Sequence, residues 1–277
     1  MHMRTLMSVL VSTGLLTAAA CAPDTSGSAA DAAGQATVQA EAPHYFDDPD
    51  LQRIYAHMME TMAPNDGWHR TRYVQFDWML DRGDAGVLRR SHRWDVWGGA
   101  YRLQAPLGKD HEMVALFNVN HPGDGRVWVD GALQEAPRAD SLLRRANAIF
   151  INDSYWLLMP YKWADPGVHA SYLGTKEMNG APYEVVELTF EGVGITPQNK
   201  YRGWVNPDSW LMDYWQHYRN ADDPEPAFTL GWTDWKRYGP IMLSDKRPDE
   251  NGNSRIYFEN LRAEEFVPEG MFEPPEM

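Results

Sequence analysis

The chain has 277 residues, of which 43% are hydrophobic and 23% are charged, so it can form a core of its own and is not disordered as a whole. Its 39 acidic residues outnumber its 25 basic residues, and the formal charge of −14 argues against binding of nucleic acid by phosphate neutralisation. A single cysteine excludes a disulfide framework, a four-cysteine zinc site and an iron–sulfur cluster.

The first 20 residues have the pattern of an export signal. Arg4 precedes the apolar run 6–11, and the small residues 17–20 come directly before Cys21. The apolar run is shorter than the roughly 20 residues of a membrane-spanning helix. We therefore predict a lipoprotein signal peptide over residues 1–20, because Cys21 resembles the acylated cysteine of a bacterial lipobox. The alternative is a plain secretory signal followed by an incidental cysteine.

Residues 21–43 are predicted to form a flexible, lipid-anchored linker. They are mostly Ala, Ser, Gly, Thr, Asp and Gln, and without an aromatic residue they bury too little apolar surface to offset their ordering entropy. No second apolar stretch of spanning length follows in the sequence. We expect residues 44–277 to form a β domain in the bacterial cell envelope that faces the periplasm, with the choice of inner or outer membrane left open.

The first element expected in this domain is an amphipathic helix. Asp48 is a suitable N-cap and Pro49 a suitable first helical residue, apolar residues recur at helical spacing from Leu51 to Met62, and Pro64 follows. A second helix is expected to begin at Pro137. Its apolar stripe lies opposite three arginines and consists of Leu142, Leu143, Ala146, Ile149 and Phe150.

Most of the remaining chain alternates with the period of two that is typical of strands. The predicted strands cover 72–80, 89–97, 101–103, 112–120, 126–129, 168–174, 183–191, 200–206, 211–219, 228–237, 240–246 and 254–262. Because turn residues join consecutive strands, the pattern predicts a mainly β protein with a single antiparallel sheet. A sheet of this length is expected to curl, with two or three helices covering its concave face.

Several features together resemble one family of envelope proteins. They are the lipobox, the first helix, the strand meander interrupted by a helix, and the segments 93–97, 192–197 and 232–239. In these features residues 45–275 resemble the LolA/LolB-like superfamily of lipoprotein carriers and lipid-binding lipoproteins, and more specifically an uncharacterised lipoprotein branch. The resemblance implies an unclosed half-barrel whose concave face receives acyl chains. LolA-type carriers are not lipidated, so Cys21 places the chain nearer LolB or other anchored members.

No catalytic or metal-binding motif occurs in the sequence. We found no metalloprotease, nucleophile-elbow, P-loop or dinucleotide pattern, and the nine histidines never have metal-ligand spacing. We therefore predict no catalytic residue, no metal site and no cofactor, and leave open whether the protein is an enzyme. Carboxylates within strands could pair as in glycosidases, but cross-strand pairing with basic residues is favoured. These carboxylates are Asp77, Asp95, Glu187, Asp213 and Asp234.

The aromatic residues provide the candidate binding site. The chain has 12 Trp and 13 Tyr beside 9 Phe, and most of the tryptophans lie in or beside predicted strands. Indoles supply large apolar areas, which suit a packed core, an acyl-chain pocket or a stacking platform for sugars. The residues predicted to line a ligand cavity are Val74, Phe76, Trp78, Trp94, Phe117, Trp128, Leu142, Phe150, Trp204, Trp215 and Trp232.

The leading hypothesis is a lipid-anchored envelope protein that binds an acyl chain or another amphiphile, from a lipid or a lipoprotein, without chemistry. Its partners would be a membrane and that acyl ligand, and nucleic acid is excluded. The alternatives are an envelope hydrolase acting on glycans or esters and a structural or partner-binding lipoprotein with a filled core. A continuous apolar pocket of a few hundred Å³ would distinguish the first hypothesis from the last.

Overall fold

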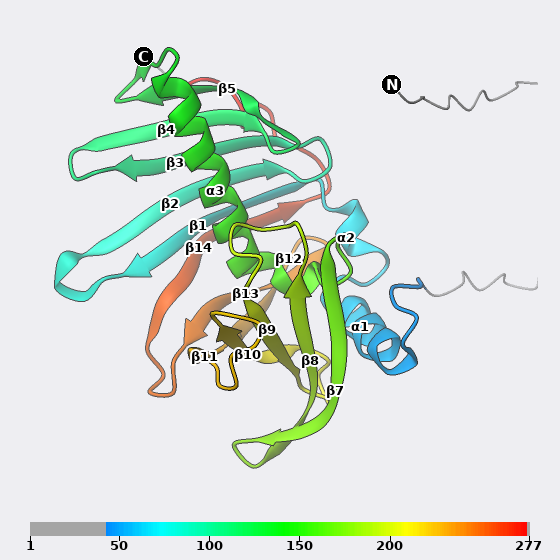
Figure 1. Cartoon of the computed structure of the whole chain (residues 1–277). Coiled ribbons are helices and arrows are strands. Elements are labelled where there is room, and N and C mark those ends of the chain that lie inside the picture. Colours follow the sequence, from blue (N-terminus) through cyan, green and yellow to red (C-terminus); the bar gives the residue numbers. More distant parts are fainter. Residues whose placement is uncertain (1–42, 276–277) are drawn as a thin grey trace, which may run out of the picture. The chain divides into compact units, whose positions relative to one another are not determined.

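The computed structural model describes residues 43–275, which form two antiparallel sheets and three helices (Figure 1). In spatial order, the nine-stranded sheet consists of β12 (Thr233–Tyr238), β13 (Ile241–Pro248), β14 (Ser254–Glu264), β1 (Tyr73–Asp81), β2 (Val87–Asp95), β3 (Ala100–Leu107), β4 (His111–Asn118), β5 (His121–Val129) and β6 (Ala132–Leu133). The five-stranded sheet consists of β11 (Phe228–Gly231), β10 (Met212–Tyr218), β9 (Lys200–Val205), β8 (Ala181–Phe190) and β7 (Val168–Met178). The helices are α1 (Pro49–Met62), α2 (Gly67–Arg70) and α3 (Arg138–Leu158).

The predicted signal peptide over residues 1–20 and the predicted lipidation site Cys21 lie outside the described residues. The predicted linker lies outside them as well, apart from Pro43. Residues 42–277 constitute one compact unit. Within the described part of this unit, no helix is long and apolar enough to cross a membrane.

The prediction of a single sheet is wrong, because the chain passes from one sheet to the other twice. The first passage is α3, which follows β6 and whose 21 residues span about 30 Å before β7 begins the other sheet. The second passage divides the predicted strand 228–237 at Trp232, where β11 ends and β12 pairs with β13. Within residues 43–275 the outer strands β12 and β6 do not pair with each other, so the nine-stranded sheet is open.

The predicted first helix is confirmed as α1, and Asp48 is its N-cap. Oδ1 of Asp48 accepts hydrogen bonds from the backbone N–H groups of Asp50 (3.0 Å) and Leu51 (2.9 Å). These are two of the donors that the start of a helix leaves without a partner. The buried face of α1 joins the main core, and the Tyr55 hydroxyl donates to the Tyr161 carbonyl oxygen at 2.9 Å.

Asp48→Ala is expected to lower the free energy of unfolding by about 1 kcal/mol, because the two capped N–H groups would lose their partner. Urea unfolding followed by circular dichroism measures this change. Asp47→Ala is the matched control. Asp47 is the exposed residue before Asp48, and its carboxylate accepts no hydrogen bond from the start of α1. Equal effects of the two substitutions would show that the cap does not stabilise α1.

The second predicted helix is confirmed as α3, which lies across the inner face of the nine-stranded sheet (Figure 1). A buried polar network attaches it to β2 and β3. Asp153 of α3 accepts a hydrogen bond from Arg90 Nη2 at 2.6 Å, and its other carboxylate oxygen lies 3.0 Å from His92 Nε2. His92 Nδ1 lies 2.6 Å from the Tyr101 hydroxyl, and the Arg90 guanidinium lies 3.9 Å from the ring centroid of Trp78. The network therefore connects α3 with three strands.

The stability of the protein is expected to fall as the pH decreases below about 6.5, the pKa of an unperturbed histidine. Burial lowers the pKa of His92 against the opposing effect of Asp153, so the unfolded chain binds a proton that the folded protein does not. Each such proton changes the free energy of unfolding by at most about 1.4 kcal/mol per pH unit. Urea unfolding at pH 7.5 and pH 5.5 measures the dependence.

His92→Gln is expected to reduce this pH dependence. The substitution should leave part of the pH dependence in place, because burial also lowers the pKa of His217. An unchanged slope in His92→Gln would contradict the assignment of this effect to His92.

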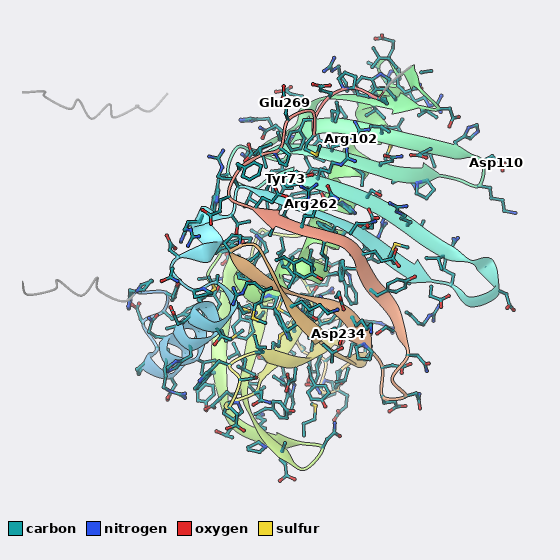
Figure 2. All side chains as sticks on the ribbon, turned by 180° about the vertical axis from the view of Figure 1, so that it is seen from behind. Tyr73, Arg102, Asp110, Asp234, Arg262 and Glu269 are labelled. Atoms are coloured by element: carbon teal, nitrogen blue, oxygen red, sulfur yellow. The ribbon has the colours of Figure 1, made fainter. Side chains whose placement is uncertain are left out.

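The segment after β14 covers part of the outer face of the nine-stranded sheet, the face opposite α3 (Figure 2). Arg102 Nη1 on β3 donates to the backbone oxygen of Glu273 at 2.7 Å. The C-terminal segment is therefore held against the sheet.

Candidate functional site

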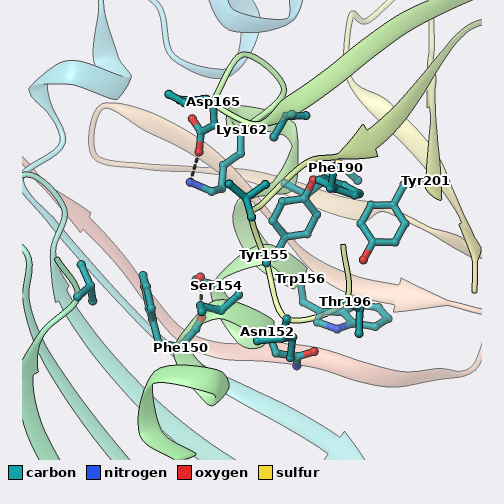
Figure 3. A pocket seen from close by; sticks show the side chains of 18 of the residues that line it. Phe150, Asn152, Ser154, Tyr155, Trp156, Lys162, Asp165, Phe190, Thr196 and Tyr201 are labelled. Carbon is teal, nitrogen blue, oxygen red and sulfur yellow. Dashed lines mark hydrogen bonds and ion pairs between the residues drawn. The ribbon is translucent and has the colours of Figure 1, made fainter. Parts of the chain in front are cut away.

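A cavity of about 390 Å³ lies between α3, the five-stranded sheet and the inner face of the nine-stranded sheet (Figure 3). Its wall is contributed by α3 and the segment that follows it, by β2, β7, β8, β9 and β10, and by loops that include the one between β8 and β9. Eight of its 22 lining residues are aromatic: Trp94, Phe150, Tyr155, Trp156, Phe190, Tyr201, Trp215 and Trp232.

The length of α3 places aromatic side chains on both sides of the cavity. Phe150 contacts Trp94 of the nine-stranded sheet, with ring centroids 5.3 Å apart and an edge-on geometry. Trp156 lies six residues further along the helix, and its ring centroid is 4.5 Å from that of Trp215 on β10. Such edge-on aromatic pairs are favourable beyond their buried area. The aromatic contacts therefore hold the helix between the two sheets.

The tyrosines of the wall are uncharged at physiological pH. Tyr155 packs beside Phe190 and Tyr201, with ring centroids 5.9 Å and 5.7 Å away (Figure 3). Burial raises the pKa of Tyr155 well above its usual value and also raises the pKa of Tyr201. Both rings thus present neutral, largely apolar surface to the cavity.

The charged residues of the lining neutralise each other. Lys162 and Asp165 form an ion pair beside the cavity (Figure 3). The other polar lining side chains are neutral amides and hydroxyls, among them Asn152 and Thr196. A cavity with an apolar wall and a few neutral polar groups is suited to an apolar molecule with a small polar end.

The loop between β8 and β9 closes one side of the cavity. Val193, Gly194, Ile195 and Thr196 line it, and Ile195 is 50% exposed. Gly192 and Gly194 have φ values of 67° and 78°, which glycine adopts readily. This loop is not among the segments that the sequence predicts to line a ligand cavity. An apolar Ile195 next to a glycine pair was the signal that could have indicated a cavity wall.

The structure brings together only some of the residues predicted to line a cavity. Trp94, Phe150, Trp215 and Trp232 lie in the wall of the cavity. Trp204 lies in a separate small cluster, and Trp128 lies beside Val114 on the outer face. The remaining predicted residues lie in the main core: Val74, Phe76, Trp78, Phe117 and Leu142. Contact of the four wall residues with a ligand stays a prediction.

Four of the five carboxylates within strands pair with basic neighbours, and Asp213 accepts hydrogen bonds from Asn206 and Tyr183. None of the five lines the cavity. Asp77 lies 2.6 Å from Arg89, and Glu187 lies 2.9 Å from Arg202. Asp234 lies 2.6 Å from Lys246, which makes a third such pair. In the part of the chain that the structure describes, no group of three or more His, Cys, Asp or Glu residues could hold a metal ion. The observed pairs are those that cross-strand neutralisation requires.

The fold and the site together define a β-rich protein with a partly open, largely apolar cavity of ligand-binding size. No family model matches the chain, and no curated protein matches its sequence. Among solved structures it is similar to a LolA superfamily protein from Nitrosomonas europaea, with 14% identity and a TM-score of 0.46 over 80% of this chain and 96% of that one.

A second similar structure is a DUF1329 family protein from Desulfovibrio piger, with 14% identity and a TM-score of 0.45. The match covers 80% of this chain and 97% of that one. The solved structures to which the chain is similar thus include a member of the LolA superfamily, which the sequence resembles.

Proposed function

We propose that this protein is a lipid-anchored envelope protein that binds an acyl chain or a similar amphiphile in the cavity, without chemistry. The observation that carries this proposal is the aromatic cavity of about 390 Å³ between α3 and the sheets. Small-molecule sites typically have volumes of about 300–1,000 Å³. Each methylene group that enters such a cavity contributes about 0.8 kcal/mol to binding. A protein whose aromatic residues only fill its core would not need this space.

The location in the envelope belongs to the same proposal. It is supported by the sequence of residues 1–43, with its export pattern, the lipobox-like Cys21 and the polar linker. A lipid anchor at Cys21 would keep the cavity close to a membrane that contains acyl chains. A bend of the nine-stranded sheet around the cavity is a further part of the proposal.

The test uses residues 42–277, which form a compact unit and lack Cys21, so any acyl chain that is detected is a ligand and not the anchor. Mass spectrometry of an organic extract of the purified unit is expected to detect bound lipid. A fluorescent fatty acid is expected to bind with saturation. A unit that contains no lipid and does not bind the fatty acid would contradict the proposal.

Val168→Phe is expected to weaken binding of the fluorescent fatty acid by about tenfold or more, because the larger side chain would occupy part of the cavity. The free energy of unfolding should change by less than about 1.5 kcal/mol, because the substitution adds apolar volume next to existing space. Val87→Phe is the control, because Val87 is 49% exposed and does not line the cavity. Unchanged affinity in Val168→Phe would place the binding site elsewhere.

A further inference from the structure

Three arginines lie in a row across the outer face of the nine-stranded sheet, the face opposite α3. Gln75 on β1 pairs with Arg262 on β14 and with Arg93 on β2, and Arg93 pairs with Arg102 on β3. Their side chains point away from the core, because they alternate with buried residues such as Val74 and Trp94. Figure 2 shows Arg102 and Arg262 on this face, close to Tyr73. In a chain with a formal charge of −14, such a concentration of positive charge needs an explanation.

The central arginine of the row is not neutralised. Arg262 is paired with Glu264 on its own strand, and Arg102 donates to the backbone oxygen of Glu273. Arg93 makes no ion pair and no side-chain hydrogen bond within residues 43–275, although it is only partly exposed. Like charges directly opposite each other in a sheet are destabilising, and Arg93 and Arg102 are such a pair. The pKa of Arg102 is lowered, first by burial and then by the charge of Arg93.

A polar groove of about 350 Å³ adjoins Arg93 on the same face. Neutral side chains line it next to the arginine, namely Gln75, Ser91 and Gln104. Asp77 also lines the groove, but its carboxylate is already bound by Arg89 at 2.6 Å and by the side-chain amide of Asn260 at 2.5 Å. Glu112 also lines the groove, where it accepts a hydrogen bond from Gln104 and where its charge opposes the lowering of the Arg102 pKa. Arg93 is therefore the lining residue whose charge is available to an anion.

We propose that Arg93, flanked by Arg102 and Arg262, binds the phosphate group of a phosphomonoester or of a phospholipid headgroup, and that the groove accommodates the attached polar group. A phosphate would relieve the repulsion between neighbouring guanidinium groups, which bind its oxygens in a bidentate manner. The site lies on the face opposite the aromatic cavity, so this proposal does not depend on acyl-chain binding.

The first test is thermal unfolding of the 42–277 unit in sodium phosphate and in sodium chloride at equal ionic strength. Phosphate is expected to raise the Tm of the wild type, because a ligand that binds only the folded state stabilises it. It should raise the Tm of Arg219→Gln as well, a control that loses the same charge at an exposed position directly after β10. Arg93→Gln should show a clearly smaller increase, because only the general stabilising effect of phosphate on folded proteins remains. In chloride it should be at least as stable as the wild type because the repulsion with Arg102 is removed.

The second test distinguishes a free phosphate ester from a lipid headgroup. Binding of glycerol 3-phosphate is measured by calorimetry, and binding of phosphatidylglycerol vesicles in a phosphatidylcholine background is measured by co-sedimentation. Saturable binding of the soluble ester indicates a free phosphomonoester, and binding of the vesicles alone indicates a headgroup. In either case Arg93→Gln is expected to weaken binding by about tenfold or more relative to Arg219→Gln.

The proposal would be overturned if Arg93→Gln and Arg219→Gln bound phosphate ligands equally well. It would also be overturned if inorganic phosphate did not raise the Tm of the wild type and the wild type bound neither glycerol 3-phosphate nor phosphatidylglycerol vesicles. If Arg93→Gln does not fold, Arg262→Gln takes its place, because Arg262 is exposed and its loss removes one guanidinium from the same row.

Discussion

Asp153→Ala is expected to lower the free energy of unfolding by about 3–5 kcal/mol, the range for breaking a buried ion pair. The Asp153 side chain is fully buried, and it accepts hydrogen bonds from Arg90 Nη2 and from Asn152 Nδ2 at 2.6 Å and 2.8 Å. Without it, the Arg90 guanidinium stays largely buried against Trp78 with no opposite charge. Burial already lowers the pKa of Arg90, and the charge of Asp153 opposes that effect. Urea unfolding followed by circular dichroism measures the loss.

Asp140→Ala is the matched control for this substitution. Asp140 lies in the first turn of the same helix and is exposed, so its removal should cost less than about 1 kcal/mol. The double variant Arg90→Leu/Asp153→Leu should recover much of the stability, because an apolar pair can replace a buried ion pair. Similar effects of Asp153→Ala and Asp140→Ala would mean that the network does not attach α3 to the sheet.

The course of most strands could be predicted from the sequence because the period of two is a local property. The division into two sheets could not, because it depends on where α3 ends. The apolar stripe predicted a helix as far as Phe150. The polar run Asn152-Asp153-Ser154 interrupts the stripe, although the helix continues to Leu158. These polar residues are compatible with the helix because Arg90 and His92, about 60 residues earlier, lie opposite Asp153. The local sequence pattern of α3 gives no information about this contact with β2, because the contacting residues are far apart in the sequence.

The candidate site could be predicted only in part for a related reason. Alternation identifies the inner face of a strand, but it does not identify which part of that face a helix covers. Leu142, Leu143 and Ala146 of α3 belong to the same core as Phe117 of β4, and none of the four lines the aromatic cavity. Tyr155 and Trp156 were missed because they belong to the part of α3 that the stripe did not reveal. The cavity lies at this second part of the helix.

Arg247→Ala is expected to lower the free energy of unfolding by about 3 kcal/mol or more, because it removes charged hydrogen bonds and leaves a cavity. Arg247 is only 1% exposed. Its Nε and Nη2 donate to the Trp156 carbonyl oxygen at 3.2 Å and 2.6 Å, and its Nη1 donates to Ser244 Oγ at 2.9 Å. Trp156 lies in the last turn of α3, where carbonyl groups lack helical partners and a cation is favourable.

The matched control for this substitution is Arg255→Ala on β14. Arg255 is exposed and donates only to the backbone oxygen of Asp81, so its loss should cost less than about 1 kcal/mol. Equal losses from Arg247→Ala and Arg255→Ala would show that Arg247 does not hold the end of α3.

Arg247→Lys connects this contact with the candidate site. The Arg247 guanidinium lies 3.5 Å from the ring centroid of Trp232, and both Trp232 and Trp156 line the cavity. A lysine keeps the charge but neither the planar stacking nor the paired donation to Trp156, so it should restore only part of the stability. Because two wall residues would lose their support, the variant should bind the fluorescent fatty acid more weakly under conditions in which it is fully folded. Wild-type affinity in the folded variant would mean that the wall is positioned by the aromatic contacts alone.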